Sequence, residues 1–166
     1  MATNIKILGL VIITVFATLF NAKLALSKND DNIIYLNFTR REVCSNRAKK
    51  CWPVALGNKN NPTPFIENPV HVLSIRRQGF TWINPFTGVK YAPGNHDLGS
   101  IWIQYTTYKG VDIGFHETPN KNVDIRNQQS LGGCIRMNKK DIIEFSKYVK
   151  YLDKIYAIRN EAPIIY

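Results

Sequence analysis

The sequence is short of acidic residues, histidine and cysteine. It has 12 Asp and Glu against 22 Lys and Arg in 166 residues, with three His and three Cys. His96 lies beside Asp97, but no second pair has the spacing that a zinc site needs. Internal repeats, low-complexity stretches and zinc-finger, helix-turn-helix or RNP patterns are also missing. The sequence therefore predicts no metal, no organic cofactor and no nucleic-acid partner.

Long apolar runs are missing too, apart from one near the N-terminus. Lys6 precedes the apolar run 7–20, and Ala25-Leu26-Ser27 resembles a small-x-small cleavage site. The run is short for a membrane span, which needs about 20 residues. We therefore expect residues 1–27 to be a signal peptide and the protein to be exported to the periplasm or cell envelope. An uncleaved anchor, with transient membrane association through this segment, is the alternative.

The remaining residues, 28–166, have room for one domain with a sizeable core. Removing Lys6 and Lys23 lowers the formal net charge from +10 to +8, because residues 1–27 contain no acid. A basic exported protein suits an acidic polymer such as the cell wall, or anionic lipid. A solvated basic surface explains the same charge equally well.

Three cysteines make an odd number for an exported chain. Cys44 and Cys51 flank a polar turn between two strand-like runs, so the ends of this hairpin come within disulfide reach. Cys134 is then the free thiol. The cysteine count and the hairpin spacing together predict one disulfide and one available nucleophile.

The segment from Phe115 to Met137 carries the pattern of a Cys/His acyl-transfer site. His116 ends an apolar run, and Cys134 follows Gly132 and Gly133 eighteen residues later. Acyl transfer by cysteine needs a thiol, an imidazole to take its proton, and N–H donors for the oxyanion. Glycines before the nucleophile leave main-chain N–H groups unobstructed. Without a family pattern, a buried thiol and a structural histidine explain the same residues more simply.

This segment resembles the signature of the L,D-transpeptidase catalytic domain of the YkuD type. The signature is a His, a loop of fixed length, Ser/Thr-His-Gly-Cys, an aliphatic residue and Arg or Asn. Gly133-Cys134-Ile135-Arg136 matches its second half, and the His-to-Cys spacing also fits. Two positions depart: Glu117 stands where Gly or Ser is common, and Gly132 stands where a second His is common. Either a main-chain carbonyl or the Glu117 carboxylate must then orient His116.

The resemblance implies an exported enzyme that acts on the stem peptides of peptidoglycan. Cys134 would form a thioester, with His116 as general base and acid, and a thiolate beside an imidazolium would have a lowered pKa. An amine acceptor gives a cross-link and water gives an L,D-carboxypeptidase. The alternative is a decayed cell-wall-binding domain. The implied oxyanion hole is the N–H groups of Gly133 and Cys134, with Gly132 also considered, and the implied substrate-binding residues are Arg136, Ser130 and Glu117. Arg136 has a structural ion pair as its alternative role.

The expected fold is mostly β, a β-rich α+β sandwich or barrel of the L,D-transpeptidase type with one helix after the nucleophile. Asn138 and Asp141 resemble a capping box, and the apolar residues Ile142, Phe145, Val149 and Leu152 recur at helical spacing. The loop 85–94 is expected to lie over a groove. Strands are expected at 33–38, 51–56, 70–75, 80–84, 101–106, 111–115 and 154–158.

Overall fold

The computed structural model describes residues 32–78, 80–119 and 124–163. All of them lie in one compact unit, Asp31–Tyr166. The predicted signal peptide, residues 1–27, lies outside the described residues. Within the described part of the chain, every helix is too short or too polar to cross a membrane.

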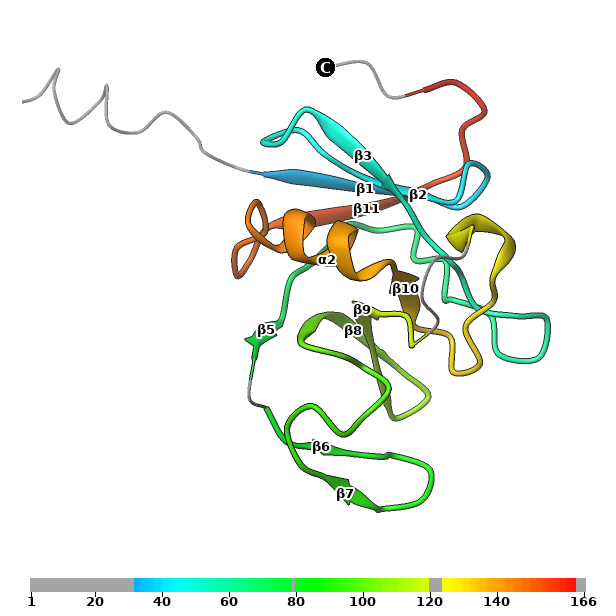
Figure 1. Ribbon diagram of the computed structural model, residues 1–166. Helices are drawn as coiled ribbons and strands as arrows, with labels where there is room; N and C mark the ends of the chain where they lie inside the picture. Colours follow the sequence, from blue (N-terminus) through cyan, green and yellow to red (C-terminus); the bar gives the residue numbers. More distant parts are fainter. Residues whose placement is uncertain (1–31, 79, 120–123, 164–166) are drawn as a thin grey trace, which may run out of the picture. The chain divides into compact units, whose positions relative to one another are not determined.

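The first sheet joins the two ends of the described chain. Its strand order is β3-β2-β1-β11-β4, and the first strand, β1, pairs in parallel with the last, β11. Sheet and strands are drawn in Figure 1. The five strands are β1 (Ile33–Asn37), β2 (Glu42–Ser45), β3 (Lys50–Pro53), β4 (Val70–His71) and β11 (Lys154–Ile158).

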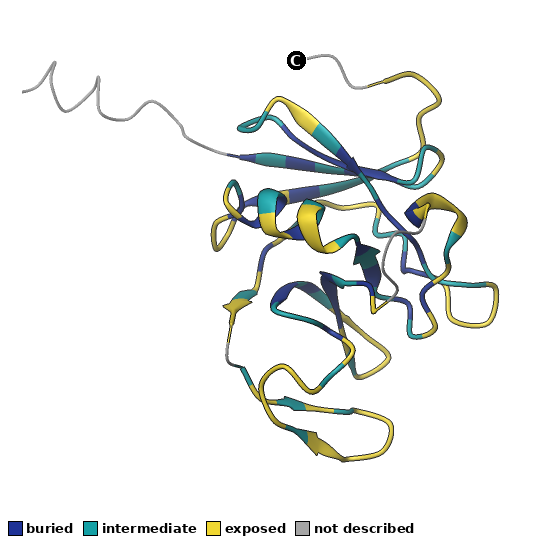
Figure 2. Cartoon of the chain, viewed as in Figure 1, coloured by how far each residue is buried: buried dark blue, intermediate teal, exposed yellow. Residues whose placement is uncertain are grey.

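The second sheet carries the residues singled out in the sequence. Its order is β10-β9-β8-β5, with β9 and β10 parallel and the other pairs antiparallel. A separate two-stranded hairpin, β6–β7, is largely exposed (Figure 2). The strands are β5 (Ser74–Arg77), β6 (Trp82–Ile83), β7 (Lys90–Tyr91), β8 (Ile101–Tyr108), β9 (Val111–Glu117) and β10 (Ile135–Met137), and a 3-10 turn η1 spans Ile125–Asn127.

One face of the second sheet forms the core. Phe115 pairs with Ile103 on one side and Ile135 on the other, and all three are fully buried. The Phe115 ring lies 5.4 Å from that of Phe145, which lies 5.2 Å from the Trp52 ring of β3. Phe145 belongs to helix α2 (Lys139–Ser146), so this helix packs between the two sheets (Figure 1).

The helix after the nucleophile is present but shorter than predicted. It begins after Asn138, whose side chain makes no capping hydrogen bond, and it ends at Ser146. Leu152, predicted on its buried face, is exposed and adopts a left-handed backbone with φ 67°. The prediction of one continuous apolar face through Leu152 is therefore wrong, because the chain turns back toward β11 after two helical turns.

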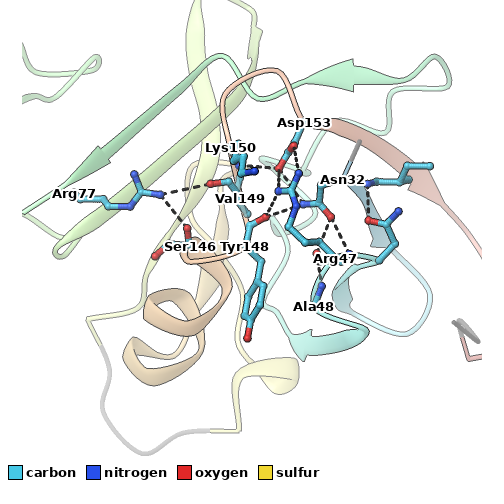
Figure 3. A network of polar contacts seen from close by, with 12 residues as sticks. Asn32, Arg47, Ala48, Arg77, Ser146, Tyr148, Val149, Lys150 and Asp153 are labelled. Carbon is cyan, nitrogen blue, oxygen red and sulfur yellow. Dashed lines mark hydrogen bonds and ion pairs between the residues drawn. The ribbon is translucent and has the colours of Figure 1, made fainter. Parts of the chain in front are cut away.

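A polar network holds this early end of the helix (Figure 3). Arg77 donates to the Ser146 carbonyl at 2.9 Å, and Arg47 donates to the Tyr148 carbonyl at 2.6 Å. Arg47 also pairs with the carboxylate of Asp153 at 3.0 Å, and Asn32 donates to both Tyr148 and Asp153. The last carbonyls of a helix lack intrahelical donors, and cationic side chains satisfy them here.

The predicted fold class is confirmed: the described chain is mostly strand, with α2 as its single α-helix. The predicted disulfide is present, since Cys44 and Cys51 face each other across β2 and β3 with sulfurs 1.98 Å apart. The run 70–75, predicted as one strand, instead divides between β4 and β5 and so passes from one sheet to the other. The sequence alternation there is weak, and sheet membership depends on partners distant in the chain.

Candidate active site

The face of the second sheet opposite the core carries a row of four aligned side chains. His116 of β9 pairs in register with Arg136 of β10 and with Trp102 of β8, and Trp102 pairs with Arg76 of β5. Residues directly opposite on neighbouring strands share one face of a sheet. All four line one cleft of about 700 Å³, which Cys134 also lines. The fold therefore brings the predicted thiol and imidazole to the same cleft.

Cys134 sits immediately before β10, two residues from Arg136 and so on the same face of that strand. Its sulfur lies 3.8 Å from the Asp112 carbonyl of β9 and is half-buried. Gly133 before it has φ +80°, and a Cβ there would come within 3.2 Å of the Pro62 carbonyl. The sequence needs glycine at this turn for both reasons.

The His116 ring is held by the main chain. Nδ1 lies 2.9 Å from the carbonyl of Glu117, and since a carbonyl only accepts, Nδ1 carries the proton and Nε2 is the acceptor. Burial, with a smaller contribution from the Arg136 guanidinium, lowers the pKa of His116 to about 4, although the carbonyls of Glu117 and Asp97 oppose the shift. His116 is therefore a neutral imidazole at neutral pH.

The Cys134 thiol is also neutral in this site. Burial raises its pKa above the ordinary value, with Asp112 acting in the same direction, while the Gly114 main chain and Arg136 lower it. The sequence predicted a thiolate beside an imidazolium and hence a lowered cysteine pKa, which is the opposite direction. Burial disfavours charge on both groups, so the thiol and the imidazole are both neutral in this site.

Two of the three predicted substrate-binding residues line the cleft. The Arg136 Nε is buried without a hydrogen-bond partner, and no carboxylate among the described residues pairs with its guanidinium. Ser130 is buried and held by a main-chain bond to Leu56. Glu117 lies elsewhere: its carboxylate faces Ser100 at 3.4 Å and Lys139 at 3.9 Å and lines a separate cleft. Its main-chain carbonyl, not its carboxylate, contacts His116.

The loop predicted over a groove does line the cleft. Phe86 and Lys90 of the β6–β7 hairpin belong to its wall, and Phe86 is 71% exposed. The nearest atom to a Cβ built at Gly132 is Cε2 of Phe86, at 4.0 Å. The position where a second histidine is common therefore opens into free space under this hairpin.

Three residues around the site could not be predicted from the sequence: Trp102, Arg76 and Tyr105. Trp102 and Arg76 belong to the row only because β8 and β5 pair in a particular register, and no sequence signal reports that register. Tyr105 of β8 is buried with its hydroxyl unpartnered, and burial, with a smaller contribution from Cys134, raises its pKa. An aromatic at an alternating strand position gives no hint of such a neighbour.

A potential set of metal ligands lies away from this cleft. The ligand atoms of Glu42, Cys44 and Cys51 lie within 4.8 Å of one another. The two sulfurs are joined in the disulfide, however, and a disulfide offers no thiolate to a metal.

Comparisons with known proteins agree with the predicted family and fold. The family model of the L,D-transpeptidase catalytic domain, YkuD, matches residues 31–156. Mycobacterium tuberculosis L,D-transpeptidase 1 is 19% identical over 78% of this chain and 60% of its own, with a TM-score of 0.55. A Mycobacterium smegmatis L,D-transpeptidase is 14% identical over 77% of this chain and 58% of its own, with a TM-score of 0.57. The C442S mutant of an Enterococcus faecium L,D-transpeptidase is 16% identical over 77% of this chain and 50% of its own, with a TM-score of 0.55.

Another matched structure is the complex of LdtMt1 with imipenem. A comparison of the sequence with curated proteins finds no match. The chain spans between half and three fifths of the length of the solved structures just described, and at these identities the likeness concerns the fold. The family model covers most of the chain and contains the His116-to-Arg136 signature, so the chain belongs to the L,D-transpeptidase catalytic domain (YkuD) family.

Proposed function

We propose that the protein is an exported cysteine acyltransferase that acts on peptidoglycan stem peptides through a thioester on Cys134. The observation that carries this proposal is that His116 of β9 and Cys134, the residue before the parallel strand β10, line one cleft in a member of this family. Export is supported by the disulfide, because disulfides persist in oxidising compartments.

The reaction begins from two neutral groups. Nε2 of His116 takes the thiol proton as the sulfur attacks the carbonyl carbon at the L-centre of the diamino acid residue. The carbon–nitrogen bond to the terminal D-alanine then breaks, and the His116 imidazolium gives its proton to the departing amine. An amine acceptor or water afterwards cleaves the thioester, which yields a cross-link or a carboxypeptidase product.

The negative charge that develops on the carbonyl oxygen needs donors. The main-chain N–H groups of Gly133 and Cys134 are our assignment, with Gly132 a third candidate, because the left-handed glycine turn places no side chain over them. Arg136 takes a substrate carboxylate in this scheme. The Arg136 Nε is unpartnered, and no carboxylate of the described residues pairs with the guanidinium, which supports this role over a structural ion pair.

The test is the covalent intermediate. Residues 28–166 are incubated with a tetrapeptide stem or a carbapenem, and intact mass and released D-alanine are measured. We expect an adduct on Cys134 with at least one of these compounds, and none in Cys134→Ala or His116→Ala. A protein that binds wall fragments but never gains mass or releases D-alanine is instead the decayed wall-binding domain.

A further inference from the structure

The row across the second sheet ends in a cation that the chemistry above does not use. Arg76 stands at the β5 end, and Arg136 stands at the β10 end, with Trp102 and His116 between them. Both arginines line the same cleft. Three strand spacings of about 4.8 Å separate the two strands, so the backbones of Arg76 and Arg136 lie about 14 Å apart.

Arg76 has no partner for its side chain among residues 32–78, 80–119 and 124–163. Its side chain is exposed and makes no hydrogen bond, ion pair or ring contact with the described residues. Arg77, the next residue, behaves differently: it points to the other face of β5 and donates to the Ser146 carbonyl. One arginine of the pair therefore holds the fold, and the other presents a free guanidinium to the cleft.

The cleft has a positive balance at its wall. Three cationic residues line it (Arg76, Lys90 and Arg136), against two acidic residues, Asp97 and Asp112. The Asp112 carboxylate already accepts a hydrogen bond from the hydroxyl of Thr107 at 2.8 Å. A guanidinium can bind a carboxylate with two parallel hydrogen bonds, whereas an ammonium is a point charge. The backbone of Arg76 belongs to the four-stranded sheet, while that of Lys90 belongs to the separate two-stranded β6–β7 hairpin. Of the two, Arg76 is the better placed to recognise a carboxylate.

We propose that Arg76 is a second carboxylate-binding residue, which makes the cleft selective for stem peptides whose carboxylates away from the scissile bond are free and not amidated. This inference rests on the proposed function. The reacting carbonyl must sit at Cys134, beside the Arg136 end of the row. Arg76 therefore meets a more distant part of the stem.

Two carboxylates of a diaminopimelate-type tetrapeptide meet this description. One is the free carboxylate of the glutamyl residue, and the other is that of the diaminopimelate side chain. Both present the same chemistry to a guanidinium. Amidating each one separately distinguishes them.

The experiment measures binding separately from catalysis. Isothermal titration calorimetry on the Cys134→Ala protein is run with the free tetrapeptide and with each monoamidated form. We expect one amidation to weaken binding about fivefold to tenfold, the scale of one partly exposed charge-assisted pair. In Arg76→Gln on the same background, the free and amidated forms should bind alike, and Arg76→Lys should recover part of the preference.

Two variants serve as controls. Arg159→Gln removes the same charge at an exposed site outside the cleft, where Arg159 lies over the Phe65 ring, and should keep the preference. Lys90→Gln removes a cation from the same cleft but outside the row. If Lys90→Gln abolishes the preference as fully as Arg76→Gln does, the general field of the cleft is responsible and the proposal is overturned.

The remaining outcomes separate this inference from the proposed function. The inference is overturned if the Cys134→Ala protein, in which Arg76 is retained, binds the free and amidated stems equally or binds none of them. If binding is selective but the protein with Cys134 intact releases no D-alanine, the enzymatic function is overturned and the carboxylate site stands. If binding is unselective but D-alanine is released, the carboxylate site is overturned and the enzymatic function stands.

Discussion

At the scale of single residues, the burial of His116 determines the chemistry most directly. A histidine with a lowered pKa stays neutral at pH values well below 6.5, so it can act as a base over a wider pH range. Burial lowers its pKa to about 4, against a reference of 6.5. We therefore expect the acid limb of the kcat/KM profile to fall near pH 4 to 5. A limb near pH 6.5 to 7 would mean that a thiolate–imidazolium pair forms in the free enzyme.

The same shift predicts a loss of stability in acid. The unfolded chain binds a proton at His116 below pH 6.5, whereas the folded chain resists it until about pH 4. Since the unfolded state binds more protons in this window, the free energy of unfolding falls as the pH drops from 6.5 to 4. The contribution is on the order of 3 kcal/mol. Urea unfolding of the wild type and of His116→Gln between pH 6.5 and pH 4 measures this. The difference between their free energies of unfolding separates the His116 contribution from that of the carboxylates.

The two glycines before the nucleophile provide a matched comparison. Gly133 has φ +80°, and its added Cβ would crowd the Pro62 carbonyl, while the space at Gly132 is open. Gly133→Ala should therefore cost about 1–2 kcal/mol, and Gly132→Ala should leave stability nearly unchanged. Thermal unfolding of both variants measures this. Equal destabilisation would show that the turn does not need a left-handed residue.

At the scale of elements, the sequence predicted what local pattern determines. The strands predicted at 101–106 and 111–115 are confirmed as β8 and β9, and Lys109 and Gly110, both with positive φ, form the turn between them. The placement of Cys134 and His116 followed from a family signature. The row from Arg76 to Arg136 could not be predicted, since it depends on the register of four strands, and two of the three connections between them are long.

The length of α2 was overestimated for a similar reason. Apolar spacing continues to Leu152, but the helix ends where guanidinium groups from other elements bind its carbonyls. The spacing of apolar residues predicts which face of a helix is buried. It does not predict where arginines distant in the sequence will bind the carbonyls at the end of the helix. Loss of this network should therefore affect the whole junction of α2 and β11.

The Arg47–Asp153 pair tests this element directly. Both side chains are largely buried, 17% and 6% exposed, and Asp153 also accepts from Asn32 and from the Lys150 main chain. Removing one partner leaves a buried charge, so Arg47→Gln should destabilise the protein by about 2–4 kcal/mol. Lys50→Gln, which breaks the exposed pair with Glu144, is the control and should shift the thermal midpoint much less. Similar shifts for both would exclude a special role for burial.

At the scale of the whole molecule, the disulfide divides the cysteines by function. Cys44 and Cys51 close the β2–β3 hairpin at one edge of the first sheet, whereas Cys134 lines the cleft of the second. The crosslink and the proposed nucleophile therefore belong to different sheets. A reductant that opens the Cys44–Cys51 disulfide should leave the Cys134 thiol chemically intact.

Alkylation of the exported protein without reductant should label Cys134 alone, as read by peptide mapping. The seven-residue separation of Cys44 and Cys51 makes the closed loop short, so the chain-entropy model gives the crosslink about 2.5 kcal/mol. Cys44→Ala/Cys51→Ala should then unfold at lower urea than the wild type by that amount, yet still acquire the carbapenem adduct on Cys134 below its unfolding transition. Label on Cys44 or Cys51 in the wild type would contradict the pairing. Loss of the adduct in the folded double variant would show that the two sheets are coupled.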